Sequence, residues 1–242
     1  MVDLTGRVAL ITGASRGIGA AVAKAYAKAG AQVVLVARTV GALETVDDEI
    51  RAEGGQATLL PMDLQKLDDI DMLGPTLAER FGRLDIAVCN AAMIGTMTPL
   101  SHMDAREWDK VMNLNLNANF RLLRTLDPLL QNADAGRMIF VSSGLAEGMH
   151  AYWGEYCVSK AALEGLARTY AAEVQSSNIR VNILLPGIVN TAMLKQAYPG
   201  GFQGETLEPE DTVETFLELA SPDCTLHGER VQVPYPQSRK RA

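Results

Sequence analysis

The sequence predicts a doubly wound α/β fold of the Rossmann type, in which a parallel seven-stranded sheet carries helices on both faces. Three observations predict this fold. Short apolar runs alternate with longer helical stretches, and these runs lack the polar alternation of a half-exposed strand. A glycine-rich turn joins the first apolar run to the first helical stretch. The 242 residues show no repeat, low-complexity segment or linker, so we expect a single domain spanning residues 1–242.

Apolar runs define the expected strands, and the stretches between them define the expected helices. The strands are expected at 8–12, 32–36, 57–61, 84–88, 137–142, 179–185 and 229–233. The helices are expected at 17–29, 42–52, 67–81, 104–130, 153–175 and 209–220. Strands joined through helices in this way form right-handed βαβ units. The segment 187–206 is expected to be irregular, and a loop of this length in a compact domain is usually functional or mobile.

The composition excludes several classes of protein. A formal net charge of -7 provides no basic footprint for nucleic acid or an anionic membrane surface. No secretory signal and no apolar run of membrane-spanning length is visible, so we expect a cytoplasmic protein. The three cysteines and three histidines show no metal-ligand spacing, and we therefore expect no metal site and reduced core thiols.

Two residues at helical spacing carry the chemistry that the sequence suggests. Tyr156 and Lys160 stand four residues apart in the helix expected at 153–175, so their side chains share one helix face. A phenol has a pKa of about 10. A neighbouring cation is expected to lower the pKa of Tyr156 toward the range where general acid/base catalysis works best. Ser143 directly follows an expected strand, and its hydroxyl could hold a substrate oxygen against the tyrosine.

The turn between the first strand and the first helix has the pattern of a dinucleotide-binding loop. Its glycines are Gly13, Gly17 and Gly19. Glycines at such a turn let the backbone approach a pyrophosphate at the helix N-terminus. A plain strand–helix turn is the alternative, but the position between a strand and a helix favours cofactor binding. The cofactor-binding residues expected here are Gly13, Ser15, Arg16, Gly17, Ile18 and Gly19.

Two arginines favour NADP(H) over NAD(H). An NAD site usually carries an acidic residue at the end of the second strand, where this chain has Ala37 followed by Arg38. Arg16, in the glycine loop, adds a second cation near the same corner. Cations without an acid suit a 2′-phosphate; NAD(H) remains the alternative, with both arginines as surface charges.

Further polar residues follow the third and fourth expected strands. Asp63, followed by Leu64, could accept a hydrogen bond from an adenine amino group, or it could cap the next helix. Asn90 and Ala91 close the fourth strand at the carboxyl edge of the sheet, where ligands bind in open α/β folds. Asn90 could equally satisfy loop backbone.

Apolar side chains are expected to border the reactive corner, although several of them could be ordinary core. They are Met93, Met97, Leu145, Met149, Tyr152, Trp153 and Met193. Such a lining would suit an apolar substrate with few polar contacts. His150 lies between Ser143 and Tyr156 and could touch substrate, whereas His102 and His227 are expected to be structural or exposed.

Taken together, these motifs resemble the short-chain dehydrogenase/reductase family, in the single-domain form related to 3-oxoacyl-carrier-protein reductases and hydroxysteroid dehydrogenases. The resemblance runs from about residue 4 to 233. The motifs stand in family order: residues 12–19, Asp63, residues 90–92, Asn115, Ser143, Tyr156 with Lys160, and Pro186 with Gly187.

The resemblance implies an NADP(H)-dependent oxidoreductase that acts on a small carbonyl or alcohol substrate. Tyr156 would be the general acid in reduction and the base in oxidation, and Lys160 would lower its pKa and hold the nicotinamide ribose. Ser143 would orient the substrate oxygen. Asn115 would bend the long helix and hold a water linked to Lys160. The residues implied at the nicotinamide are Tyr156, Lys160, Pro186, Gly187, Ile188 and Thr191.

The chain departs from the family pattern at two places. Ala92 stands where the family often has glycine, and residues 234–236 replace the usual Asp-Gly-Gly after the last strand. That end packs at a subunit interface in the family, so the expected homo-oligomer could be a dimer or a tetramer. A dinucleotide-binding protein that has lost catalysis is the alternative function, although such proteins usually lose the tyrosine or lysine that this chain keeps.

Overall fold

The computed structural model describes residues 2–148 and 150–235, and within them seven parallel strands form one sheet. The strand order is β3-β2-β1-β4-β5-β6-β7. The bounds are β1 (Val8–Thr12), β2 (Gln32–Ala37), β3 (Gln56–Pro61), β4 (Ile86–Cys89), β5 (Arg137–Val141), β6 (Arg180–Leu185) and β7 (Arg230–Gln232). The doubly wound, seven-stranded fold expected from the sequence is therefore confirmed.

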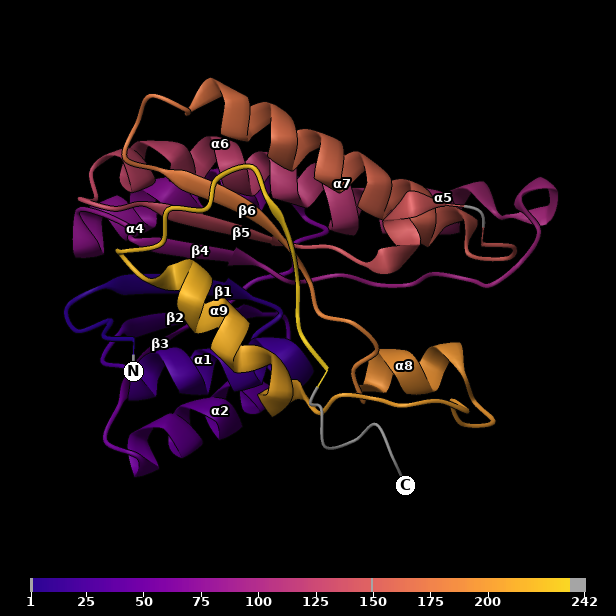
Figure 1. Cartoon of the computed structure of the whole chain (residues 1–242), viewed down its shortest axis with the longest axis horizontal. Coiled ribbons are helices and arrows are strands. Elements are labelled where there is room, and N and C mark those ends of the chain that lie inside the picture. The colour runs from indigo at the N-terminus through magenta and orange to yellow at the C-terminus, as the bar shows by residue number, and fades with distance from the viewer. Residues whose placement is uncertain (1, 149, 236–242) are drawn as a thin grey trace.

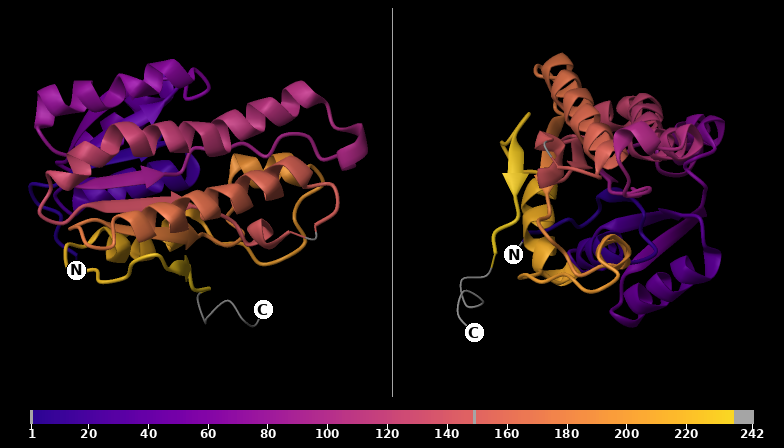
Figure 2. Two further views of the ribbon diagram at one scale, coloured as in Figure 1. Left: turned by 90° about the horizontal axis from the view of Figure 1, so that it is seen from above. Right: turned by 90° about the vertical axis from the view of Figure 1, so that its right-hand side faces the viewer.

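Helices cover both faces of the sheet (Figure 1). One layer contains α1 (Gly17–Lys28), α2 (Val40–Ala52) and α9 (Val213–Ala220), and the other contains α4 (Leu73–Phe81), α6 (Ala118–Gln131) and α7 (Gly154–Glu173). The end view in Figure 2 shows the sheet between these two layers. Three shorter helices, α3 (Leu67–Asp71), α5 (Ala105–Met112) and α8 (Ala192–Ala197), complete the set of α-helices in the described residues.

The strands are apolar on both sides because each side packs against helices. In β1, Ala9 and Ile11 join the core under α1 and α9, whereas Val8 and Leu10 join the core under α6 and α7. Alternate residues of one strand therefore feed two separate cores. This is why the sequence shows continuous apolar runs rather than alternation.

The helix expected at 67–81 is two helices, α3 and α4, which meet at Met72. The Thr125 side chain of α6 lies at this junction. Its hydroxyl donates to Asp71 O at 3.1 Å and accepts from Gly74 N at 3.0 Å. A side chain that takes these backbone groups interrupts the helical hydrogen-bond ladder.

The helix expected at 104–130 is also divided, by a π-helical turn at Asn113–Asn117 between α5 and α6. Single π turns of this kind often occur at functional sites. This π turn contains Asn115, the residue at which the family resemblance implied a bend.

The expectation of an irregular segment at 187–206 is partly wrong, because α8 lies within it. The Thr191 side chain caps this short helix by accepting from Leu194 N at 3.3 Å. A threonine before a helix-forming run is a recognised start signal. The last strand is shorter than expected, with three residues in β7.

The order of the sheet reverses between β1 and β4, which are hydrogen-bonded neighbours. In open α/β sheets, the carboxyl edge at such a reversal is the usual ligand site.

Candidate active site

The turn between β1 and α1 is shaped for close backbone approach. Gly13 and Gly17 have φ of +66° and +57°, a region that other residues rarely adopt. A Cβ on Gly19 would lie 2.3 Å from Gly13 O and 2.7 Å from Asn90 Nδ2. A side chain at Gly13 or Gly19 is therefore excluded.

Asn90 fastens this turn to the end of β4. Its Nδ2 donates to Thr12 O at 2.9 Å. The Thr12 hydroxyl accepts from Asn90 N at 2.9 Å and from Ala91 N at 3.0 Å, and it donates to Val88 O at 3.2 Å. Asn90 thus satisfies loop backbone, as its alternative interpretation stated, and in doing so it fixes the glycine turn.

Arg16 and Arg38 are both exposed, and neither side chain forms a hydrogen bond or ion pair within the described residues. Arg16 precedes α1, and Arg38 directly follows β2. Ala37 ends β2 without a carboxylate. Two free cations beside a glycine turn can take an anionic group.

Asp63 does not cap a helix by its side chain. Its Oδ1 accepts from Gln65 N at 3.1 Å, and α3 begins after Lys66. Leu64 is buried in the core on the α6 and α7 side. Of the two roles considered for Asp63, helix capping is therefore wrong, and adenine recognition stays a prediction.

Tyr156, Ser143 and Lys160 lie together at the carboxyl end of β5. A side-chain hydrogen bond joins Ser143 to Tyr156. Lys160 Nζ donates to Val141 O at 2.8 Å and lies 5.8 Å from the centre of the Tyr156 ring. Lys160 is 2% exposed and Tyr156 is 8% exposed, so the amine and the phenol hydroxyl lie in a site with little water.

The expected lowering of the Tyr156 pKa is wrong. Burial raises the pKa of Tyr156 to about 12, and the hydrogen bond with Ser143 opposes the shift only in part. Burial also lowers the pKa of Lys160 to about 8, against the opposing influence of Cys89 and Glu164. Withdrawal from water is the largest influence on both pKa values, because each charged form loses its hydration.

Asn115 joins three segments of this site. Its Oδ1 accepts from Met93 N at 2.9 Å, and its Nδ2 donates to Met93 O at 2.8 Å. The same Nδ2 donates to Ser159 Oγ at 2.9 Å, and Ser159 in turn donates to Tyr156 O at 2.8 Å. The π turn, the loop after β4 and α7 are thus held together by one buried amide.

The turn after β6 completes the border of the site. Gly187 has a φ of +78°, and Thr191 lies against the glycine turn, because a Cβ on Gly17 would be 3.3 Å from Thr191 Cγ2. Ile188 N donates to the hydroxyl of Tyr235 at 3.0 Å. Tyr235 was not expected from the sequence, because it lies in the segment where the chain departs from the family pattern and carries no motif of its own.

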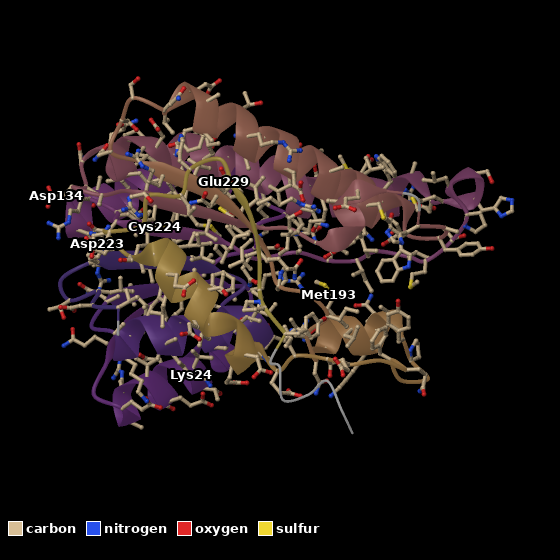
Figure 3. The ribbon with its side chains drawn as sticks, viewed as in Figure 1. Lys24, Asp134, Met193, Asp223, Cys224 and Glu229 are labelled. Carbon is tan, nitrogen blue, oxygen red and sulfur yellow. The ribbon has the colours of Figure 1, made fainter. Side chains whose placement is uncertain are left out.

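The apolar lining is partly as expected. Tyr156, Ile94 and Ala197 form a small cluster with Leu145, Trp153 and Met193 packed against it. Met193 lies on the side of α8 that faces the rest of the molecule (Figure 3). The Tyr198 ring lies 6.2 Å from Trp153 and 5.1 Å from Phe202, so aromatic side chains continue the lining.

Other residues of the expected lining differ. Met97 and Tyr152 are exposed, and Met149 lies outside the described residues. Ile94, Ala197, Tyr198 and Phe202 were not expected, because nothing in the sequence pattern places the 197–202 segment beside Trp153.

The histidines are spread over the fold. His227 accepts from Val181 N at 3.3 Å and its Nε2 lies 2.8 Å from Ala171 O, so it joins β6 to the end of α7. His102 and His150 are exposed. Within residues 2–148 and 150–235, no group of histidine, cysteine or acidic residues could hold a metal ion, and no helix is long and apolar enough to cross a membrane.

Comparisons with known proteins agree with this geometry. A family profile described as short chain dehydrogenase matches residues 7–200. The chain is 36% identical over 223 residues to the uncharacterized oxidoreductase YciK of Escherichia coli (strain K12), covering 91% of this chain and 88% of that protein.

Two solved structures are similar to this chain over almost its whole length. A Pseudomonas syringae protein assigned to the same family has a TM-score of 0.92 at 39% identity, with 96% of each chain covered. A protein from Escherichia coli CFT073 complexed with NADPH has a TM-score of 0.91 at 35% identity, with 96% of this chain and 98% of that chain covered.

Proposed function

This chain belongs to the short-chain dehydrogenase/reductase family of oxidoreductases, and on that premise we propose that it interconverts a carbonyl and a secondary alcohol with NADP(H). The observation that carries the proposal is the meeting of Asn115, Ser143, Tyr156 and Lys160 at one corner of the carboxyl edge.

The accessible backbone of the glycine turn supports a dinucleotide. Gly13, Gly17 and Gly19 leave backbone open beside the N-terminus of α1, where Ser15, Arg16 and Ile18 would also contact the pyrophosphate. Asp63 and Leu64 would border the adenine, and Asn90 and Ala91 the adjoining ribose. Pro186, Gly187, Ile188 and Thr191 would border the nicotinamide. A similar protein complexed with NADPH supports this assignment.

NADP(H) differs from NAD(H) by a 2′-phosphate on the adenosine ribose, so the residues expected near this position indicate which cofactor binds. Arg16 and Arg38 are free cations, and no carboxylate follows β2. A guanidinium binds a phosphate more strongly than it binds neutral ribose hydroxyls, which an acidic residue usually holds in NAD sites. We therefore propose NADP(H), with NAD(H) as the weaker candidate.

The nicotinamide supplies or accepts the hydride when it is bound, so the chain must hold the substrate and handle one proton. In reduction, the Tyr156 hydroxyl donates its proton to the substrate oxygen. The raised pKa of Tyr156 keeps the phenol protonated at neutral pH, which is the form that this direction requires. In oxidation Tyr156 must lose its proton first, and the charged Lys160 would stabilise the phenolate.

The other two residues hold the acid in place. Ser143 forms a hydrogen bond with Tyr156 and would direct a substrate oxygen toward it. Asn115 fixes α7 through Ser159 and the loop after β4 through Met93. The described lining of Ile94, Leu145, Trp153 and Met193 is apolar, which supports an apolar substrate without a charged group near the reacting carbon.

The direct test of function is NADPH consumption by the wild-type protein over ketones, 3-oxoacyl thioesters and steroids. We expect turnover of at least one class of apolar carbonyl compound. Tight NADPH binding without turnover on the whole panel would instead support a catalytically silent dinucleotide-binding protein.

Cofactor choice gives a first specific prediction. Arg38→Ala should raise the dissociation constant of NADPH about tenfold, because a charge-assisted hydrogen bond to the 2′-phosphate is lost. Binding of NADH should change little. Intrinsic fluorescence titration with both cofactors measures this, and Arg124→Ala on α6 is the control with the same change of charge. Tighter binding of NADH than NADPH by the wild-type protein would overturn the NADP(H) assignment.

We also propose that residues 1–242 act as one domain and that the protein is a homo-oligomer. The family resemblance is the support for a homo-oligomer.

A further inference from the structure

Three consecutive residues at the end of β5 are each tied to a different turn of α7. Ser143 is hydrogen-bonded to Tyr156, and Val141 O accepts from Lys160 Nζ at 2.8 Å. Between them in the chain, Ser142 Oγ donates to Glu164 Oε1 at 2.7 Å. Tyr156, Lys160 and Glu164 stand four residues apart and so share one helix face. Glu164 therefore extends the line of the proposed acid and amine by one further turn.

Glu164 is a buried carboxylate that the proposed mechanism does not use. Its side chain is 6% exposed. Arg230 Nε of β7 donates to its Oε1 at 3.2 Å, and Arg168 Nη1 donates to its Oε2 at 3.1 Å. A buried charge persists only when it is paired and hydrogen-bonded, and here both conditions hold.

Arg230 links this carboxylate to the other side of Ser143. Its Nη1 donates to Glu147 Oε1 at 2.5 Å, and Glu147 ends the 3₁₀ turn Gly144–Glu147, which begins directly after Ser143. Glu229, labelled in Figure 3, marks where the chain enters β7. The Arg230 guanidinium therefore contacts both sides of the Ser143 segment. After Ser143 it binds Glu147 directly, and before Ser143 it binds Glu164, which accepts a hydrogen bond from Ser142.

We propose that Glu164 and Arg230 are positioning residues, which hold the Ser143 segment against the helix face that carries Tyr156 and Lys160. The proposal rests on the proposed function for its catalytic meaning, whereas the contacts themselves do not depend on it. Neither residue touches the reacting atoms. Arg230 brings β7 into the support of the site, and Glu164 places a negative charge one turn beyond the Lys160 amine.

The influence of the Glu164 charge on the Lys160 amine can be measured through the pKa of Lys160. Glu164 on α7 and Cys89 on β4 favour the protonated amine, burial opposes it, and the Tyr156 ring lies 5.8 Å away. From β5 the amine meets only the backbone carbonyl of Val141. Removing the Glu164 charge should thus lower the pKa of Lys160 further.

Arg168 provides a matched control. It binds the same carboxylate as Arg230, but it lies on α7 itself, is 54% exposed, and forms no hydrogen bond or ion pair with β5 or the 3₁₀ turn in the described residues. If Glu164 only stabilised α7, Arg168→Gln and Arg230→Gln would have the same effect on hydrogen exchange in the Ser143 segment. If Glu164 and Arg230 position that segment, Arg230→Gln has the larger effect.

The test uses Glu164→Gln, Arg230→Gln and Arg168→Gln in the full chain. Lysine-selective ¹³C NMR titration, with Lys160→Met for assignment, should show the pKa of Lys160 lowered by about half a unit or more in Glu164→Gln. Hydrogen exchange of amides 142–147 should quicken about tenfold or more in Arg230→Gln and stay within twofold in Arg168→Gln. Arg230→Lys should recover part of this protection.

Turnover gives the functional arm of the same experiment. With NADPH and 1-phenyl-1,2-propanedione, kcat should fall about tenfold in Glu164→Gln and Arg230→Gln, with NADPH affinity within twofold of wild type. Equal exchange in the two arginine variants, or an unchanged Lys160 pKa, would overturn the proposal. If Glu164→Gln does not fold, Glu164→Asp replaces it, with a smaller change of the same sign.

The two arms separate the two claims. If the wild-type protein reduces no carbonyl compound, the proposed function fails, but the NMR and exchange measurements still decide whether Glu164 and Arg230 hold the Ser143 segment.

Discussion

The ionisation of two side chains shows what residue spacing can and cannot predict. The four-residue interval correctly placed Tyr156 and Lys160 on one face of α7. It could not predict burial, because burial depends on the packing of β5, α7 and the loop after β4. In the structure, burial is the main influence on both groups. It raises the pKa of Tyr156 and lowers the pKa of Lys160, which favours the neutral form of each.

The buried Lys160 amine gives a prediction about stability. The pKa of Lys160 in the fold is about 8, whereas that of lysine in water is about 10.4. The unfolded chain therefore binds more protons between these values, so Lys160 makes the free energy of unfolding rise with pH in that window. Between pH 7.5 and pH 10, this contribution should amount to about 2 kcal/mol.

Urea unfolding of the wild-type protein and Lys160→Met at the two pH values isolates the contribution. Other groups titrate equally in both proteins, so the stability of the wild type relative to the variant should increase from pH 7.5 to pH 10. A difference that is the same at both pH values would show that the amine is not withdrawn from water.

At the scale of the elements, local sequence signals predicted each strand and most helices, and contacts between distant segments changed the rest. The breaks at Met72 and at Asn113–Asn117 arise where α6 and the loop after β4 meet the helices. Thr125 causes the first break from fifty residues away in the chain. No periodicity within residues 67–81 contains that information. An irregularity of the long helix at Asn115 was implied only by the family resemblance, and as a bend rather than as a π turn.

The π turn leads to a further prediction about stability. Asn115→Ala would remove both partners of the Met93 backbone, so the free energy of unfolding should fall by about 2 kcal/mol or more. Asn117→Ala is the control in the same turn, because Asn117 is exposed and, within the described residues, its side chain is hydrogen-bonded only to Asn113. Its stability should remain within about 0.5 kcal/mol of wild type. Equal loss in both variants would contradict the role given to Asn115.

At the scale of the whole molecule, the sheet order explains why the candidate residues meet. The parallel strands end at one edge, so residues after β1, β2, β4, β5 and β6 converge although the chain separates them widely. This convergence was predictable from the sequence. The contribution of the last segment was not, because Tyr235 and Arg230 reach the site only after β7 has joined the sheet. The remaining residues 236–242 lie outside the described part of the chain.

The central claim is that the Tyr156 hydroxyl passes the proton at a site that binds NADP(H). The most direct measurement compares Tyr156→Phe with the wild-type protein in NADPH affinity and in turnover of a carbonyl substrate found in the panel. We predict a loss of turnover of about 100-fold or more, with NADPH affinity nearly unchanged, because the phenyl ring keeps its packing and lacks only the hydroxyl that carries the proton. Turnover retained by Tyr156→Phe would contradict the account.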